Sequence, residues 1–310
     1  MKLVFCGTPQ FAVPSLERLA ATGFNIQLVV TQPDRPLGRG LELTAPPVKQ
    51  SALKLGLPVI QPEKIKKNEE FQAHLKSIQP DAIIVVGYGR IIPPWMLELP
   101  RYGNINVHAS LLPKYRGAAP VQWAIANGET LTGITTMLLN EGLDTGDILL
   151  QREMKIEEKE TAVTLAPRLA QMGADLLVET LRGLEQEKIK PLPQDHSQGT
   201  LAPILTKEDG LVDFKRTAQE IQNRLRGFQP WPGAYTQFRG KNLKLVEVKA
   251  AGVLSGLGAA ELRIEGEKLL VGCGNGTALE LLQIQPEGKK PMTAREFING
   301  YRPTQAERLG

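Results

Sequence analysis

The side chains best suited to chemistry lie in one short segment of the chain. Asn106 and His108 are two residues apart in a run that reads as a strand, so both point to the same face. There, an amide and an imidazole could hydrogen-bond to one small reacting group or exchange a proton with it. The alternative is a core histidine satisfied by a neighbour, and the local pattern favours a catalytic His108. We expect His74 and His196, the other two histidines, to lie on the surface.

A carboxylate stands in a glycine-bounded loop farther along the chain. Asp144 lies between Gly142 and Gly146, just after a predicted strand, where it could orient His108 or take a proton. A plain turn explains the same residues, because Asp and Gly favour turns for backbone reasons. The Asp-Thr-Gly triplet also occurs in aspartic proteases, but those are all-β proteins that need two such carboxylates. This chain has one triplet in an α/β setting, which excludes that class.

Two further segments bear on ligand binding. The turn after the first strand, Phe5-Cys-Gly7-Thr-Pro9, lacks the Gly-x-Gly-x-x-Gly spacing, and Pro9 removes an amide that could hold a phosphate. A dinucleotide, and with it a nicotinamide dehydrogenase, is therefore disfavoured. The loop at 32–40 carries Arg35 and Arg39 between glycines and prolines. It could clamp a phosphate backbone, or it could be an ordinary surface loop with solvated charges.

The first 189 residues alternate between predicted strands and helices. Strands that are apolar on both faces, such as 81–87, belong to parallel sheets covered by helices. The pattern predicts helices after the first strand, at 119–126 and at 161–186, and strands at 2–7, 25–32, 58–61, 81–87, 104–109, 133–140 and 147–156. This alternation predicts a Rossmann-like α/β domain with a mostly parallel open sheet and helices on both faces. Such sheets bind ligands at the carboxyl ends of their strands.

The pattern changes after residue 189. Residues 190–206 hold prolines and a glycine among polar residues and read as a linker. Beyond it, the capping boxes Thr217–Glu220 and Thr293–Glu296 predict two helices. Between these helices, short runs predict five strands, at 234–239, 243–249, 261–264, 268–272 and 278–285. Five short strands favour a small OB-like barrel, so we expect domains at 1–189 and 207–310.

Charge and composition indicate which partners and which cellular location to expect for the protein. The formal net charge is +4. The whole excess lies in residues 209–310, which favours a polyanionic partner, although an ordinary soluble surface can carry the same excess. The longest strongly apolar run, 82–86, is too short to cross a membrane, and two cysteines cannot complete a zinc cage. We therefore expect a cytoplasmic protein with no membrane segment and no metal.

Taken together, these motifs resemble the folate-dependent formyltransferases. The resemblance rests on Asn106-Val-His108, on Ser110-Leu-Leu-Pro113 followed by Arg116-Gly117, and on Leu143-Asp-Thr-Gly-Asp147. Four more segments are similar to the branch of the family that acts on methionyl-tRNA: Phe5–Pro9, Thr31–Gly40, Arg116–Pro120 and Phe228–Pro232. The resemblance covers nearly the whole chain, including the second domain.

The resemblance implies a reaction and a role for each residue. The donor 10-formyltetrahydrofolate would pass its formyl group to the α-amino group of methionyl initiator tRNA, without a metal. Asn106 would bond the developing oxyanion, and His108 would donate a hydrogen bond or carry a proton. Asp144 would hold the tautomer of His108 and help to remove the amine proton.

The resemblance also implies binding residues. The folate site would be lined by Ser110, Leu111, Leu112 and Pro113, and tRNA would be bound by Arg35 and Arg39 together with the C-terminal domain. The chain departs from the family pattern at Leu41-Glu-Leu43, where lysines are expected, so the RNA affinity of this loop would rest on the two arginines.

Two other functions fit parts of the sequence. A formyltransferase for a small amine, such as a nucleotide sugar or a purine precursor, would need no basic second domain. A non-catalytic RNA-binding module would need no set of Asn106, His108 and Asp144. Nothing in the sequence requires more than a monomer.

Overall fold

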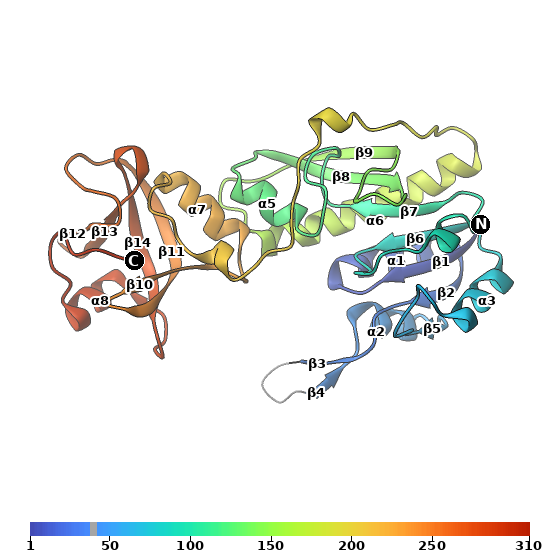
Figure 1. Ribbon diagram of the computed structural model, residues 1–310, viewed down its shortest axis with the longest axis horizontal. Coiled ribbons are helices and arrows are strands. Elements are labelled where there is room, and N and C mark those ends of the chain that lie inside the picture. The colour runs from blue at the N-terminus through green and yellow to red at the C-terminus, as the bar shows by residue number, and fades with distance from the viewer. Residues whose placement is uncertain (38–41) are drawn as a thin grey trace. The chain divides into compact units, whose positions relative to one another are not determined.

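The computed structural model describes residues 1–37 and 42–310, which form two compact units (Figure 1). The first unit comprises Met1–Pro120, Leu131–Lys155 and Ala166–Ala202. The second comprises Val121–Thr130, Ile156–Leu165 and Pro203–Gly310. Short 3-10 turns occur at Gln10–Ala12, His196–Gln198, Glu208–Gly210 and Gly274–Gly276.

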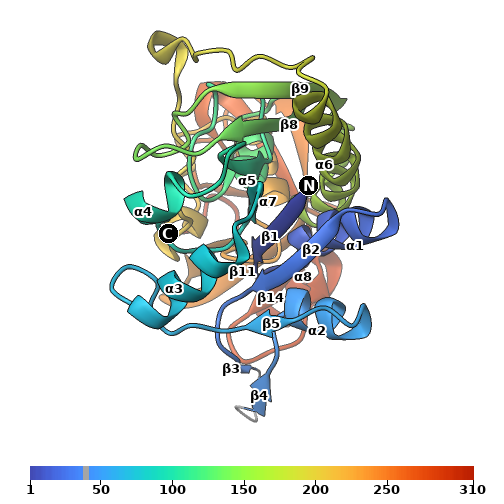
Figure 2. The ribbon, with the colours of Figure 1, turned by 90° about the vertical axis from the view of Figure 1, so that its right-hand side faces the viewer.

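The first unit is built on a seven-stranded sheet (Figure 2). In spatial order its strands are β5 (Val59–Ile60), β2 (Asn25–Val30), β1 (Lys2–Gly7), β6 (Ala82–Val86), β7 (Asn104–His108), β8 (Leu131–Leu138) and β9 (Ile148–Lys155). The first five run parallel to one another, and β8 is antiparallel to both of its neighbours, β7 and β9. The predicted α/β class with a mostly parallel sheet is confirmed. The order reverses between β1 and β6, and ligands of such sheets bind at that point.

Helices cover both faces of this sheet (Figure 2). One face carries α1 (Val13–Ala21), α2 (Pro47–Lys54) and α6 (Ala162–Glu185). The other carries α3 (Glu69–Ile78) and α4 (Pro94–Leu97). Burial explains the arrangement: Phe71, Leu75 and Met96 of α3 and α4 pack on alternate residues of the central strands. The sheet is therefore doubly wound, as central strands that are apolar on both faces, such as β6, indicate.

The segment predicted as a loop after β2 contains a short antiparallel pair (Figure 1). Its strands are β3 (Arg35–Leu37) and β4 (Glu42–Thr44), and Arg35 pairs with Thr44. Strands of three residues are too short for an alternating pattern to reveal them, which is why the sequence predicts only a loop here.

Close packing of α6 fixes which way β7 faces. A Cβ on Gly173 would lie 2.9 Å from Cγ1 of Val107, so the glycine lets the helix approach that face of the strand. Because side chains alternate along a strand, Asn104, Asn106 and His108 then lie on the opposite face. The amide of Asn104 confirms this, because it donates to the Met96 carbonyl of α4 at 2.8 Å.

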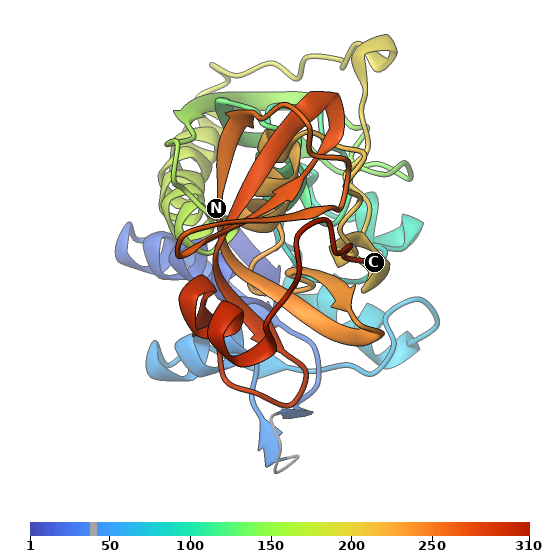
Figure 3. The ribbon, with the colours of Figure 1, turned by 90° about the vertical axis from the view of Figure 1, so that its left-hand side faces the viewer.

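The second unit contains an antiparallel sheet that curls strongly, shown in orange to red in Figure 3. Its strands, in spatial order, are β10 (Ala234–Phe238), β11 (Lys241–Val253), β14 (Thr277–Pro286), β13 (Lys268–Gly272) and β12 (Leu262–Glu265), with β15 (Met292–Thr293) beside β14. Three helices belong here: α5 (Pro120–Ala126, from its second residue), α7 (Ala218–Gly227) and α8 (Ala294–Tyr301). The five predicted strands and both predicted capping boxes are confirmed. The core of the sheet is apolar and includes Leu281 and Phe297.

Among the described residues, none of the helices has the length and apolar character needed to cross a membrane.

Both cysteines are free and buried, which leads to a prediction about pH. Burial raises the pKa of the Cys273 thiol to about 12 and raises that of Cys6 as well. An unfolded thiol has a pKa of about 8.5. The buried thiols therefore make their full contribution to the free energy of unfolding below that pH, and the contribution falls as the pH rises toward the pKa in the folded state. We expect Ellman's reagent at pH 8 to label neither thiol in the native protein and both in denaturant. Rapid native labelling would contradict this.

Tyr88 is buried with an unsatisfied hydroxyl. Its ring packs in the core between the sheet, α3 and α4, and within the described residues its hydroxyl has no hydrogen-bond partner. An unpaired buried hydroxyl destabilises the folded state. We expect Tyr88→Phe to leave the free energy of unfolding unchanged or to raise it by about 1 kcal/mol, measured by urea denaturation. A loss of stability would show that the hydroxyl is bonded in solution.

Candidate active site

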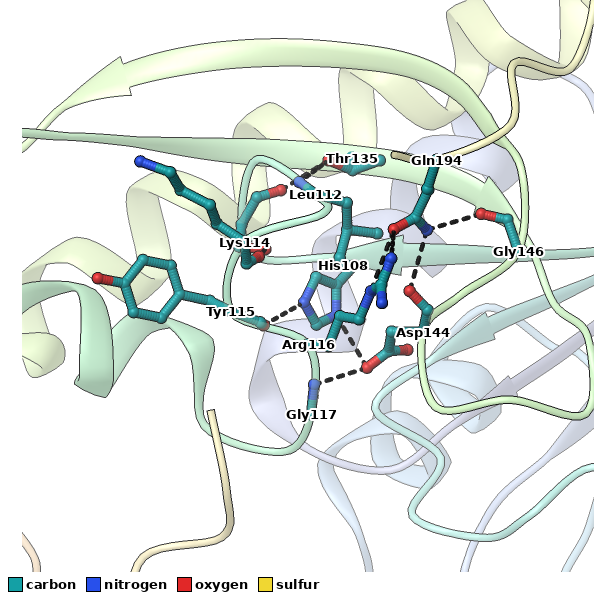
Figure 4. A network of polar contacts seen from close by, with 11 residues as sticks. His108, Leu112, Lys114, Tyr115, Arg116, Gly117, Thr135, Asp144, Gly146 and Gln194 are labelled. Atoms are coloured by element: carbon teal, nitrogen blue, oxygen red, sulfur yellow. Dashed lines mark hydrogen bonds and ion pairs between the residues drawn. The ribbon is translucent and has the colours of Figure 1, made fainter. Parts of the chain in front are cut away.

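His108 ends β7 and is almost fully buried (Figure 4). Its Nε2 lies 2.9 Å from the carbonyl oxygen of Tyr115. A carbonyl oxygen can only accept, so Nε2 carries a proton and donates it to this bond. Nδ1 faces the carboxylate of Asp144, at 3.7 Å from Oδ2. The structure therefore brings the predicted imidazole and carboxylate together. The Tyr115 carbonyl, rather than Asp144, holds the tautomer, because 3.7 Å is too long for a hydrogen bond.

The Asp144 loop reaches His108 by folding back along the sheet. It leaves β8 at Leu138, which pairs with Ile105 near the start of β7, whereas His108 lies at the other end of that strand. The backbone of this loop passes very close to the end of β8, because a Cβ at Gly146 would collide with the carbonyl oxygen of Leu138. The glycine is therefore required by the close approach of two backbone segments. Asp144 is thus not in a plain surface turn.

Several bonds fix the conformation of Asp144 (Figure 4). Its φ is 49°, in the left-handed region that a residue with a side chain adopts at a cost. The backbone N–H of Gly117 donates to Oδ2 at 2.8 Å. The amide of Gln194 donates to the Asp144 carbonyl at 2.9 Å and to the Gly146 carbonyl at 2.7 Å. A strained residue held in this way is typical of functional sites.

Gln194 and Arg116 are parts of the site to which sequence reasoning gave no role. The guanidinium of Arg116 is buried and donates to Oε1 of Gln194 through Nε at 3.2 Å and Nη2 at 2.6 Å. Nη2 also donates to Nδ1 of the exposed His196 at 2.9 Å. Gln194 lies in the segment that reads as a linker, and a single buried glutamine gives no periodic signal. Only the Arg116-Gly117 dipeptide of the family motif could have pointed here.

Asn106 lies on the same face of β7 as His108, as its spacing predicts. Its side chain is half-buried, and within the described part of the chain its amide makes no hydrogen bond. An amide held on a strand with free donors is suited to bind an oxygen of a substrate.

The predicted folate segment follows directly after β7. The hydroxyl of Ser110 is buried and donates to the carbonyl of Lys114 at 2.6 Å, and Leu112 is buried beside Met137. Leu111 and Pro113 are partly exposed. The carbonyls of all four residues also accept hydrogen bonds within the protein, and the N–H of Leu112 donates to Thr135. The partly exposed side chains of Leu111 and Pro113 are therefore the groups most open to a ligand.

Of the two predicted RNA-binding arginines, Arg35 begins β3 and is exposed, and Arg39 lies outside the described residues. The start of the β3–β4 hairpin is anchored at Asp34, whose carboxylate accepts from Lys49 at 2.7 Å and from Gln61 at 2.6 Å. These bonds, from Gln61 first, lower the pKa of Asp34 below its usual value.

The arrangement can support acyl transfer to an amine. It offers an amide for an oxyanion, an imidazole nitrogen for a proton and a carboxylate next to that nitrogen. Among the described residues, no three His, Cys, Asp or Glu side chains gather as metal ligands would.

Curated relatives match over the full chain. A protein of Koribacter versatilis named methionyl-tRNA formyltransferase is 66% identical over 100% of this chain and 99% of its own length. A protein of Acidobacterium capsulatum with the same name is 61% identical over 100% of both chains.

Solved structures match at lower identity. An N-formyltransferase from Helicobacter canadensis, in complex with folinic acid and dTDP-3-aminofucose, aligns with a TM-score of 0.67 at 21% identity, covering 92% of this chain and 99% of that one. A sugar 3N-formyl transferase in the presence of dTDP and 5-N-formyl-THF aligns with a TM-score of 0.67 at 19% identity, covering 94% and 99%. These matches show a shared fold.

Two family descriptions match the chain. Residues 1–181 match the formyl transferase family, and residues 204–302 match the formyl transferase C-terminal domain. With relatives above 60% identity over the whole length, this chain belongs to the formyl transferase family, among the methionyl-tRNA formyltransferases.

Proposed function

We propose that this chain transfers a formyl group from 10-formyltetrahydrofolate to the α-amino group of methionyl initiator tRNA, and that Asn106, His108 and Asp144 carry the reaction. The acceptor follows from relatives that bear this name at up to 66% identity. A folate-derived donor agrees with the family and with the folate compounds named in related structures. The observation that carries the catalytic assignment is the 3.7 Å separation of His108 Nδ1 and Asp144 Oδ2.

The chemistry is an exchange between two amides. The neutral amine attacks the formyl carbon, and because an α-amino group has a pKa of about 8, little base strength is needed. The attack puts a negative charge on the formyl oxygen. The amide of Asn106 donates to this oxyanion, and a preorganised donor of this kind lowers the barrier by about 3–4 kcal/mol. The intermediate collapses when the bond from the formyl carbon to N10 of the folate breaks.

One proton must move from the attacking amine to N10. The lone pair of His108 Nδ1 can take it, since the Tyr115 carbonyl keeps the other proton on Nε2. The resulting imidazolium is stabilised by the Asp144 carboxylate beside it. His108 then returns the proton to N10 as the leaving group departs. No covalent enzyme intermediate forms, and the chemistry calls on no metal.

We also propose how the chain is organised for this reaction. Residues 1–189 form the catalytic domain, 190–206 the linker and 207–310 an OB-like barrel domain that binds tRNA. Ser110, Leu111, Leu112 and Pro113 contact the folate through the groups that remain free, and Arg35 and Arg39 contact the RNA. We also propose that the protein works as a monomer in the cytoplasm.

The proposal is tested by mixing the protein with methionyl initiator tRNA and 10-formyltetrahydrofolate labelled in the formyl group. We expect labelled N-formylmethionine after hydrolysis of the tRNA. A parallel reaction with an amino sugar linked to dTDP serves as the control, because the solved relatives include sugar formyltransferases. Transfer to the sugar and not to the tRNA would overturn the proposal.

A further inference from the structure

A short stretch of the predicted linker runs beside the loop that follows β7. It comprises residues 199–202, which belong to the first unit, and we refer to it as the strap. Leu201 forms a parallel bridge with Arg116, and the N–H of Thr200 donates to the carbonyl of Pro113 at 3.3 Å. The strap therefore contacts the segment of backbone that surrounds the proposed catalytic side chains.

The peptide unit between Tyr115 and Arg116 is held from one side by the strap. Its N–H, which belongs to Arg116, donates to the carbonyl oxygen of Thr200 at 2.8 Å. Its carbonyl, which belongs to Tyr115, points the opposite way because a trans peptide unit is planar. There it accepts the proton of His108 Nε2 (Figure 4). The strap thus sets the direction of the carbonyl that holds the tautomer of His108.

The next peptide unit, between Arg116 and Gly117, is arranged in the same way. Its carbonyl accepts from the N–H of Ala202 at 2.7 Å, and its N–H donates to Oδ2 of Asp144 at 2.8 Å. The two segments are close, since a Cβ on Gly117 would lie 2.6 Å from the carbonyl oxygen of Ala202. Two consecutive peptide units therefore contact the strap on one side and a proposed catalytic side chain on the other.

The conformation of Tyr115 depends on Thr200. Its φ is 61°, in the left-handed region, which a residue with a side chain adopts at a cost and keeps only when its surroundings hold it there. The hydroxyl oxygen of Thr200 accepts from the N–H of Tyr115 at 2.8 Å. Thr200 therefore holds the N–H groups on both sides of the Tyr115 α-carbon. Relaxation of Tyr115 to a negative φ would turn its carbonyl away from His108.

The direction of this carbonyl decides which nitrogen of His108 is free to take a proton. While the carbonyl accepts from Nε2, the lone pair stays at Nδ1. If the carbonyl turned away, the Asp144 carboxylate near Nδ1 would favour a proton on Nδ1 instead, and the lone pair facing Asp144 would be lost.

We propose that Thr200 is a positioning residue for formyl transfer, because its hydroxyl holds Tyr115 in the conformation that keeps Nδ1 of His108 unprotonated. Thr200 itself does not touch the reacting atoms. The inference rests on the proposed function, in which Nδ1 takes the proton of the attacking amine.

The first test compares Thr200→Val and Thr200→Ser in single-turnover formylation of methionyl-tRNA by the full-length protein. The valine has nearly the shape of threonine but no hydroxyl, and we expect the rate to fall by about 10–100-fold, as when a residue that orients a catalytic group is lost. The KM values for tRNA and for the folate donor should stay within about twofold of the parent, since the backbone bonds of the strap remain. Thr200→Ser keeps the hydroxyl and should restore the rate. Equal losses in the two variants, or an unchanged rate in Thr200→Val, would overturn the proposal.

A matched control removes a threonine hydroxyl elsewhere in the first unit. Thr22 follows α1, and its hydroxyl donates to the carbonyl of Arg18 at 2.7 Å. Thr22→Val should form product at the rate of the parent. Because Thr200 is exposed, the melting temperatures of both valine variants should lie within about 2–4 °C of the parent. A rate that follows the melting temperature across the variants would show an effect on stability alone and contradict the proposal.

The tautomer of His108 can be measured without any substrate. Imidazole nitrogen chemical shifts in ¹⁵N-labelled protein show which nitrogen carries the proton, and the signals missing from His108→Ala identify this residue. We expect the proton on Nε2 in the parent and in Thr200→Ser, and a shift of population toward a proton on Nδ1 in Thr200→Val. The tautomer of the parent in Thr200→Val would overturn the proposal whatever the rate. If the parent forms no N-formylmethionine, the proposed function fails, and the tautomer still decides whether Thr200 positions His108.

Discussion

Replacing His108 with alanine is expected to lower kcat for formyl transfer by about 10²–10⁴-fold, the range typical of a lost acid–base group. The imidazole is the one group placed to accept a proton at Nδ1 while its Nε2–H is held by the Tyr115 carbonyl. Binding of tRNA should change little, because His108 is buried at the end of β7 and not on the RNA-binding surface proposed above. Single-turnover formylation and a filter-binding titration measure the two effects.

A matched control for this substitution is His74→Ala. His74 lies on α3, is exposed and packs in neither described core cluster. We expect its kcat to match that of the parent. Activity of His108→Ala within a few-fold of the parent would count against the role of the imidazole.

The second large effect is expected at Gln194, a positioning residue. Its amide holds the Asp144 and Gly146 carbonyls and accepts from the buried guanidinium of Arg116. Gln194→Leu can neither donate to the two loop carbonyls nor accept from Arg116. We expect kcat to fall by about 10–100-fold, the range seen when a residue that orients a catalytic group is lost. The leucine should also destabilise the fold, because it removes the acceptor of the buried Arg116 Nε and leaves Nη2 with only His196 Nδ1.

Gln194→Glu separates these two effects. A carboxylate still accepts from Arg116, so the melting temperature should stay closer to that of the parent than in the leucine variant. It cannot donate to the two loop carbonyls, so kcat should remain low while the KM for tRNA is unchanged. Gln198→Leu, an exposed site in the same segment, is the control. If kcat follows the melting temperature across the three variants, Gln194 acts on stability alone.

The sequence predicts much of the fold because its signals are local. The central strands β1 and β6 carry nearly continuous apolar runs, and the ends of all seven strands of the first unit differ from the predicted ones by no more than two residues. The Thr217–Glu220 and Thr293–Glu296 capping boxes mark the starts of α7 and α8. Short elements such as β3, β4 and α4 are missed, because three or four residues cannot display a period. The eight-residue helix α2 is missed as well.

The candidate site is predicted only in part, because its parts meet through tertiary folding. Strand alternation places Asn106 and His108 on one face without further information. The approach of Asp144 depends on a loop that doubles back along β7, and no local pattern encodes that path. Gln194 lies 50 residues from Asp144 in a segment with the composition of a linker. The family motifs associate Asp144 with His108, which hydrophobic periodicity cannot do. The family that these motifs indicate is confirmed by the relatives.

The central claim is that Asn106, His108 and Asp144 act as one unit on the formyl carbon. The most direct test compares single-turnover formylation of methionyl-tRNA by Asn106→Ala, His108→Ala, Asp144→Asn and the triple variant. Residues that act as a unit are strongly non-additive, so the triple variant should be about as slow as the slowest single variant. If the three losses multiply, the residues contribute independently and the shared site described above is contradicted.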